Sequence, residues 1–180
     1  RYGVGGLDFW IVKLNSSGVF EWQRRLGART EDISYSLQQT NDGGFILAGS
    51  SNGFNGISVY QTFYDGDIYD HINSSFYDSW VVKINSTGSI EWSKLLGGNA
   101  NDAANSIQKT SDGGFIISGY SESNNGDVSG NHGGGDSWIV KLNSGGGVEW
   151  QKSLGGTGSE NAISIQQTND GNYIIGGHSS

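Results

Sequence analysis

The chain has 180 residues, no cysteine, no proline and no methionine, and a formal net charge of −8 at pH 7. This length can bury one sizeable core, and the absence of cysteine excludes a disulfide framework. The ten Lys and Arg residues are scattered rather than gathered in a basic stripe, and no run approaches the roughly 20 apolar residues of a membrane-spanning helix, so we expect no nucleic-acid partner and no membrane insertion.

The start of the chain and its composition bear on where the protein resides. The chain opens on Arg1 without an initiator methionine or a signal-like segment, which indicates a mature form or an excised fragment. The acidic balance and the abundance of Gly, Ser and Asn are typical of extracellular proteins. We therefore expect a secreted or cell-surface location.

Three copies of one 42-residue unit account for most of the chain, and the remainder is insertion. The units are 8–49, 78–119 and 136–177, the insertions are 50–77 and 120–135, and 1–7 has the character of the tail of a further insertion. Repetition of this kind indicates a repeat architecture. We therefore treat 1–180 as a single repeat array.

Each unit predicts four short strands. In the third unit they are Trp138–Asn143, Val148–Leu154, Ala162–Thr168 and Tyr173–Gly177. In the third of these strands, Ile163, Ile165 and Gln167 are expected to alternate with Ala162, Ser164 and Gln166. Asn-Ser-Gly-Gly and Asn-Asp-Gly-Asn lie between strands, as tight hairpin turns require, and no window has a convincing helical period. The pattern predicts an all-β fold of three four-stranded antiparallel units, the blades of a β-propeller.

Side chains that recur in every unit are expected to serve the scaffold. Trp22, Trp92 and Trp150 align, and we expect them to pack between neighbouring blades. Glu21, Glu91 and Glu149 align as well. Identical repetition suits a structural role, whereas a glycosidase needs one distinct carboxylate pair.

Two runs resemble the repeats of the bacterial SBBP-type β-propeller family, found in large secreted surface proteins of Bacteroidetes-like bacteria. They are SIQKTSDGGFIISGYS, from Ser106, and GDSWIVKLNSGGGVEWQKSLGG, from Gly135. The resemblance covers each unit and implies that the Ser-Ile-Gln strand is innermost and the Glu-Trp strand outermost. The chain would then begin with the outer two strands of one blade and end with the inner two of another.

Three blades' worth of strands are too few to close a ring, since propellers have about four to eight blades. Two interpretations remain open. The chain is a piece of a longer propeller, which we favour, or copies associate, for example two chains that make six blades.

The two insertions join equivalent strands, so they are expected to cluster on one face, where loops on a rigid scaffold commonly bind ligands. The first insertion combines aromatic rings with carboxylates, which suits a glycan, and a protein ligand is the alternative. Its candidate ligand-binding residues are Tyr60, Tyr64, Asp65, Asp67, Tyr69 and His71.

Carboxylates in the insertions are also candidate Ca²⁺ ligands. They are Asp65, Asp67 and Asp70 in the first insertion and Asp127 and Asn131 in the second, with His132 and Asp136 nearby. The frame of an EF-hand is missing. The histidines lack the spacing of a zinc site.

Signals for catalysis are weak, and we expect no enzyme. Gly49–Gly53 matches G-x-S-x-G, but no helical pattern follows it and no triad order supports it. The favoured interpretation is a non-catalytic binding or adhesion module. The alternatives are a structural or assembly unit and, less favoured, part of a glycan-active hydrolase or lyase whose catalytic residues lie in other blades.

Overall fold

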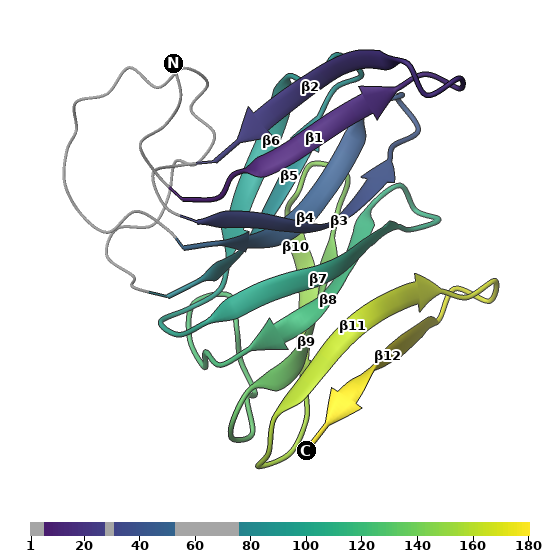
Figure 1. Cartoon of the computed structure of the whole chain (residues 1–180). Coiled ribbons are helices and arrows are strands. Elements are labelled where there is room, and N and C mark those ends of the chain that lie inside the picture. Colours follow the sequence, from purple (N-terminus) through teal and green to yellow (C-terminus); the bar gives the residue numbers. More distant parts are fainter. Residues whose placement is uncertain (1–5, 28–30, 53–75) are drawn as a thin grey trace.

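The computed structural model of the chain describes residues 6–27, 31–52 and 76–180, and these residues form an all-β structure, as predicted (Figure 1). The strands are β1 (Phe9–Leu14), β2 (Phe20–Leu26), β3 (Asp32–Gln39), β4 (Phe45–Ser51), β5 (Asp78–Ile84), β6 (Ile90–Leu96), β7 (Asp102–Lys109), β8 (Phe115–Ser121), β9 (Asp136–Leu142), β10 (Val148–Leu154), β11 (Glu160–Gln167) and β12 (Tyr173–Ser179). No helix in the described part of the chain could cross a bilayer.

The strands form two complete and two partial antiparallel sheets. The complete sheets have the orders β3-β4-β5-β6 and β7-β8-β9-β10, and β1-β2 and β11-β12 form two-stranded sheets. Each complete sheet therefore combines the last two strands of one repeat with the first two of the next. This strand order is the one that the family resemblance implies, and it makes the sheet, rather than the repeat, the unit that packs.

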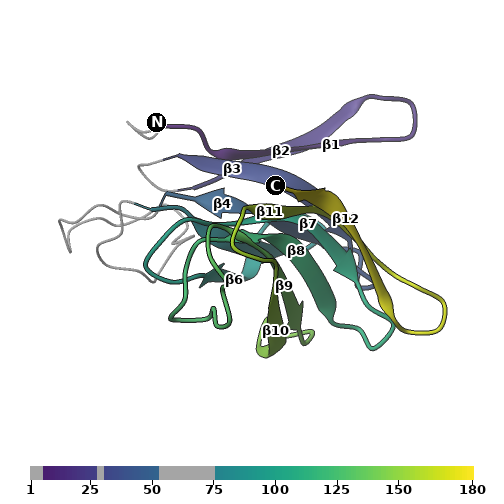
Figure 2. The ribbon, with the colours of Figure 1, turned by 90° about the horizontal axis from the view of Figure 1, so that it is seen from below.

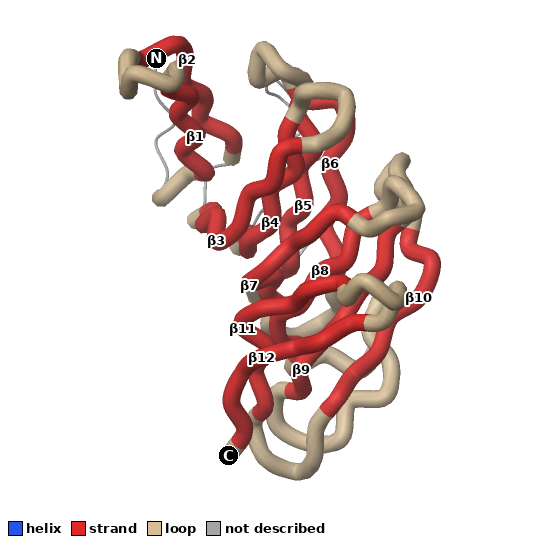
Figure 3. Tube along the Cα trace, turned by 90° about the vertical axis from the view of Figure 1, so that its right-hand side faces the viewer, coloured by secondary structure: helices blue, strands red, loops and turns tan. Residues whose placement is uncertain are grey.

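The sheets stack face to face and fan out from one margin. β3 contacts β7 and β7 contacts β11, whereas β6 and β10 at the opposite margin have no comparable contact. Figures 2 and 3 show β1 and β2 as a separate layer beside the first complete sheet. The apolar core accordingly lies in three layers, one between each pair of neighbouring sheets.

The repeated tryptophans pack between sheets, as predicted. Each contacts the aromatic residue that opens a strand of the next sheet, with ring centroids 5.8 to 6.1 Å apart. The pairs are Trp22–Phe45, Trp92–Phe115 and Trp150–Tyr173. The recurrence of the Glu-Trp pair in the sequence thus reflects one contact made three times.

The predicted alternation in the third strand of each unit is wrong at one position. The register of β11 with β12 shifts between Ala162 and Ser164, which marks a β-bulge. Ile163 is consequently 50% exposed while Ile165 is 1% exposed. Equivalent shifts occur in β3, between Ser34 and Ser36, and in β7, between Ala104 and Ser106.

A buried lysine links three strands of each complete sheet. Lys141 of β9 lies 2.9 Å from Asp112 Oδ2, in the β7–β8 turn, and 3.0 Å from Glu149 Oε2 of β10. Lys83 has the same partners in the other sheet, Asp42 and Glu91. The repeated glutamates that contact Lys83 and Lys141 therefore have the structural role expected of them.

We call Lys141, Asp112 and Glu149 a buried-lysine triad, and its aspartate also organises the β7–β8 turn. Asp112 Oδ1 accepts hydrogen bonds from the Thr110 hydroxyl and from the Gly114 amide. Hydrogen bonds from Thr110, from Lys141 and from Gly114 hold the pKa of Asp112 well below its ordinary value. Asp42 has the same three kinds of partner, and its pKa is lowered in the same way.

This lowered pKa predicts a pH-dependent contribution to stability. Ionised Asp112 stabilises the fold fully above its unfolded-state pKa of about 3.9, and this contribution is lost as the pH falls through the lowered folded-state pKa. We expect Asp112→Asn to lower the free energy of unfolding by about 1 kcal/mol at pH 7, a small effect because the carboxylate is more than half exposed and screened by solvent. The difference between the variant and the wild type should shrink progressively below pH 4, measured by urea unfolding.

Asp42→Asn in the other complete sheet provides a replicate, because Asp42 has the same contacts. An equal loss of stability at pH 7 and at pH 2 would show that ionisation of the carboxylate does not matter.

Candidate functional site

The long connections all leave the stacked sheets at one edge. Ser51 pairs with Asp78 and Ser121 pairs with Asp136, so both insertions leave and re-enter at the same ends of their strands. The connections between sheets leave from this edge too, and the tight hairpin turns lie at the opposite edge (Figure 1). We call the edge that carries the connections the insertion edge. The clustering predicted for the insertions is confirmed at their described ends.

Most of the first insertion lies outside the described residues. This applies to the candidate ligand and metal residues Tyr60, Tyr64, Asp65, Asp67, Tyr69, Asp70 and His71, and to Gly53 of the G-x-S-x-G match. The described parts are its two ends, 50–52 and 76–77.

Both ends of the first insertion are held by hydrogen bonds at the insertion edge. The Tyr77 hydroxyl donates to Glu31 Oε2 at 2.7 Å, and the Asn52 amide donates to the Glu31 carbonyl at 2.9 Å. The Tyr77 carbonyl accepts from the Asp102 amide at 2.6 Å. The hydrogen bond to Glu31 raises the pKa of Tyr77, and burial adds to the shift.

The two candidate calcium ligands of the second insertion are engaged in hydrogen bonds, Asp127 with the scaffold and Asn131 with the scaffold and within the insertion. Asp127 Oδ2 accepts from the Gly97 amide at 3.2 Å. Asn131 donates to the Ser121 carbonyl at 2.9 Å and accepts from the Gly133 amide at 3.0 Å. Within 6–27, 31–52 and 76–180, no three His, Cys, Asp or Glu side chains are placed to hold a metal ion. Calcium binding stays a prediction, and the Asp65, Asp67 and Asp70 part of it concerns residues that the structure does not describe.

His132 and Asp136, which the sequence places near these ligands, contact each other. His132 Nδ1 lies 2.7 Å from Asp136 Oδ2, and the His132 amide donates to both carboxylate oxygens at 3.3 Å. Asp136 is fully buried at the start of β9. This contact therefore fixes the return of the second insertion into its sheet.

A buried carboxylate fixes the other end of the second insertion. Asp102 Oδ2 accepts from the Ser123 hydroxyl at 2.7 Å and from the Gly98 amide at 2.8 Å. Burial raises the pKa of Asp102, although these hydrogen bonds oppose the shift. Val128 is buried in the core between the two complete sheets. The second insertion is therefore anchored to the scaffold through Ser123 and Val128, while most of its other residues are exposed.

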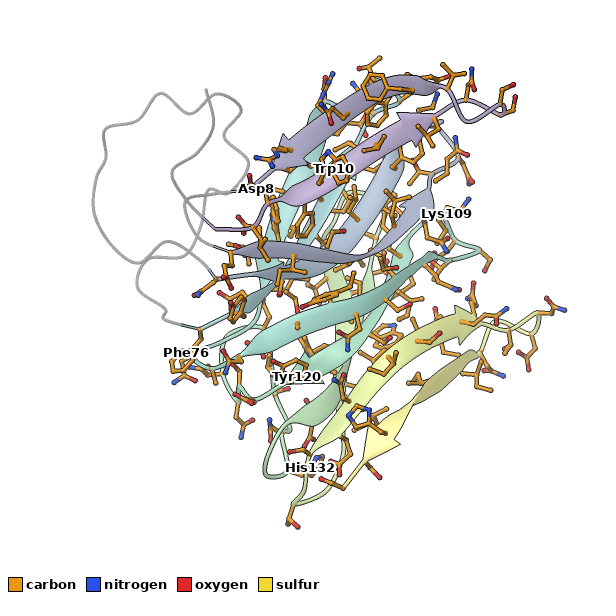
Figure 4. The ribbon with its side chains drawn as sticks, in the orientation of Figure 1. Asp8, Trp10, Phe76, Lys109, Tyr120 and His132 are labelled. Carbon is orange, nitrogen blue, oxygen red and sulfur yellow. The ribbon has the colours of Figure 1, made fainter. Side chains whose placement is uncertain are left out.

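Aromatic side chains from three segments gather where β3 and β7 begin. We call Tyr35, Phe76, Tyr77 and Tyr120 the tyrosine rim. Tyr35 and Phe76 are exposed, and the phenol of Tyr35 contributes to the raised pKa of both Tyr77 and Tyr120. Tyr120 pairs with Ala103, one residue into β7. Figure 4 labels Phe76 and Tyr120 in this region.

Carboxylates accompany the tyrosine rim. Glu31 accepts from Tyr77, and Glu122 accepts from the Asn101 side chain at 2.9 Å. Burial raises the pKa of Tyr120, and the negative charge of Glu122 contributes. Rings with an apolar face and a polar tip, next to carboxylates that accept hydrogen bonds, suit the apolar faces and hydroxyl groups of a sugar.

Sequence reasoning missed Tyr35, although a signal was present. Tyr35 lies within a repeated unit, where the expectation was a scaffold role. The equivalent positions hold Asn105 and Ile163. The three side chains at this bulge position therefore differ in chemistry, which sets the position apart from the repeated scaffold residues.

Comparison with known proteins gives little further guidance. No family model matches the chain. The Regulatory protein FlaEY of Caulobacter vibrioides is 28% identical over 177 residues, an alignment that covers 96% of this chain and 18% of FlaEY. The chain thus spans less than a fifth of the length of that protein.

A glycine at the insertion edge is predicted to be irreplaceable. A Cβ at Gly97 would lie 2.4 Å from Asp78 Oδ1 and 2.5 Å from Asp102 Oδ2, too close without displacing a buried carboxylate. We expect Gly97→Ala to lower the free energy of unfolding by about 2 kcal/mol and to increase hydrogen exchange in 122–135.

Gly156→Ala is the matched control, because a Cβ there would meet nothing within 4 Å. It should change stability by no more than about 0.5 kcal/mol. Equal unfolding free energies for the two variants would show that the carboxylates tolerate the methyl group.

Proposed function

We propose that the chain is an arc of a β-propeller that serves as a non-catalytic binding or adhesion module of a secreted or cell-surface bacterial protein. The ligand is a glycan or a protein, and it binds at the insertion edge. The tyrosine rim is the observation that carries this proposal.

The arrangement of the sheets supports the propeller part of the proposal. Four-stranded antiparallel sheets that fan out from neighbouring innermost strands are the blades of a propeller. Here β3, β7 and β11 are the innermost strands, and the sheets pack through the repeated tryptophan contacts. The secreted, Bacteroidetes-like origin rests on the resemblance of the repeats and on the acidic composition.

The distribution of repeated and unrepeated residues supports the binding part. The scaffold contacts recur from sheet to sheet, whereas the tyrosine rim is made of residues that differ between units or belong to an insertion. Variable side chains at one edge of a rigid scaffold are the usual basis of ligand recognition.

A glycan is the favoured ligand, because the rim has two exposed rings, Tyr35 and Phe76. Carboxylates accompany its other two rings: Tyr77 donates to Glu31, and the charge of Glu122 acts on Tyr120. The first insertion brings further aromatic rings and carboxylates in sequence, including Tyr64 and Asp65. Calcium held by Asp65, Asp67 and Asp70 would bind sugar hydroxyls or order the insertion.

A structural or assembly role is the second candidate. It is favoured by the second insertion, whose polar side chains Ser123, Asp127 and Asn131 are engaged in contacts with the scaffold. A role as part of a glycan-active hydrolase or lyase has less support, because the repeated carboxylates Glu91 and Glu149 bind lysines.

A glycan array separates the first two candidates. We expect the wild-type chain to bind a defined set of glycans and Tyr35→Ala to weaken binding by roughly ten-fold, the loss of one well-placed contact. Ile163→Ala is the matched control, because Ile163 occupies the equivalent bulge position with similar exposure but lies in β11. Absence of glycan binding by the wild type would favour the structural role.

Calcium is tested with the same chain. We expect Ca²⁺ to raise the melting temperature and EDTA to reverse the rise, with both responses lost in Asp65→Ala/Asp67→Ala. A melting temperature that ignores Ca²⁺ would remove calcium from the proposal without affecting the glycan result.

A further inference from the structure

The two partial sheets have complementary free edges. In the complete sheets β4 pairs with β5 and β8 pairs with β9. β12 is the counterpart of β4 and β8, and β1 is the counterpart of β5 and β9. Among the described residues, β12 and β1 each lack this neighbour. The edge of β12 therefore lacks a strand of the β1 type, and the edge of β1 lacks a strand of the β12 type.

Apolar side chains of β1 are exposed where their counterparts are buried. Trp10 is 65% exposed, whereas Trp80 and Trp138 are 0% and 1% exposed. Val12 is exposed, while its counterpart in β9, Val140, is buried. The same residue types therefore occur in β1, but the surface that should cover them is missing.

The free strand at the other end shows the same contrast. Ile174 of β12 is 61% exposed, whereas Ile46 and Ile116 are both 0% exposed. Ile175 is exposed as well, and its counterpart Ile117 is buried. Both ends of the stack thus present side chains that the interior sheets bury.

The buried-lysine triad is divided between the two ends. Lys13 of β1 contacts Glu21, but the aspartate that completes the triad around Lys141, Asp112, has no counterpart near Lys13 within the described part of the chain. That counterpart is Asp170, in the β11–β12 turn, and no lysine contacts it among the described residues. At the position where a lysine of each complete sheet binds two carboxylates, Lys13 therefore has one carboxylate partner, Glu21, and Asp170 has no lysine partner among the described residues.

A shallow hollow beside β12 matches the exposed indole of β1. Ser137 and Gly177 are among the residues that line it. In a complete sheet the counterpart of Gly177, Gly49, lies opposite Trp80, and the ring of Phe9 occupies the space beside Gly49. The hollow therefore lies where Trp10 of a strand paired with β12 would insert.

We propose that β12 of one copy of this chain pairs antiparallel with β1 of a second copy and completes a four-stranded sheet. The register of β8 with β9 places Ile175 opposite Val12 and Gly177 opposite Trp10. It also brings the Asp170 turn to Lys13, as the Asp112 turn comes to Lys141.

Two copies satisfy both edges at once. The contact joins different surfaces, so it propagates from copy to copy until the ring closes. Each copy contributes enough strands for three four-stranded sheets. Two copies therefore give six blades, within the range of about four to eight that propellers have, whereas three copies would exceed that range. The proposal rests on the propeller arrangement proposed above and is independent of the ligand at the insertion edge.

The mass in solution is the first test. The 180-residue chain has a mass of 19.2 kDa, and we expect sedimentation equilibrium to give twice this value. Asp170→Lys places a second ammonium group beside Lys13 and should weaken dimerisation by roughly ten-fold. A monomeric wild type at all concentrations would overturn the proposal and leave these edges to further repeats of a longer polypeptide.

Engineered disulfides test the register. The chain has no cysteine, and Val12 and Ile175 are partly exposed, so replacing both should not disturb the fold. Directly opposed residues of an antiparallel pair have Cα atoms about 4.5–5.5 Å apart, within disulfide range. Val12→Cys/Ile175→Cys should form a covalent dimer that reductant separates.

Val12→Cys/Ile174→Cys is the matched control, because Ile174 points to the opposite face of the strand. It should form at least ten-fold less covalent dimer. Equal cross-linking of the two variants, or a disulfide within a single chain, would overturn the proposed pairing. Glycan binding that persists in a monomeric chain would overturn this inference alone.

Discussion

The structure depends on covering both faces of each complete sheet with the neighbouring sheets. All seven residues of β5 are buried, because β5 lies inside a sheet that is itself packed on both sides. Strands buried in this way have nearly continuous apolar runs rather than alternating ones. The contacts of Trp22 with Phe45 and of Trp92 with Phe115 then set how one sheet sits on the next. Because the sheets are held in this stack, the starts of β3 and β7 lie at fixed positions at the insertion edge.

A charged residue within such a run needs special provision. A lysine ammonium in an apolar interior is unfavourable unless it is paired and hydrogen-bonded. Lys83 is nearly fully buried and meets this requirement with Asp42, Glu91 and the Ile84 carbonyl. Because the two carboxylates come from the β3–β4 turn and from β6, the lysine ties the inner part of the sheet to the outer one.

Much of this fold could be predicted from the sequence, and the exceptions have physical causes. Repeated residues identify repeated contacts, so the strands, the hairpin turns and the packing of Trp150 followed from the alignment of the units. The sheet order needed the family resemblance, because pairing within one repeat satisfies the same hydrophobic pattern. The bulge at Ile163 was missed, since one extra residue in a strand leaves no trace in a period of two.

The candidate site was harder to predict than the scaffold. The tyrosine rim combines Tyr35 from a strand, Tyr77 from the end of one insertion and Tyr120 from the start of the other, and these positions are far apart in sequence. These positions come together because β3 packs against β7 of the next sheet, a contact between sheets that the sequence does not show. The expected binding residues Tyr60 to His71 belong to a segment that does not repeat, so no second copy in the chain guides their interpretation.

The ends of the array follow from the same constraint as its interior. Repeat arrays that end in solution usually have terminal units with polar outer faces, and exposed sheet edges are commonly blunted by charge or proline. The end strand β1 instead has residues of the interior type: Trp10 and Lys13 occupy the positions of Trp80 and Lys83, and no proline is present. Residues suited to burial at both ends, with complementary charges and a common register, are characteristic of surfaces that are covered when the protein functions. In the pairing proposed above, a second copy of the chain would present at its opposite end the contacts that the interior sheets already make.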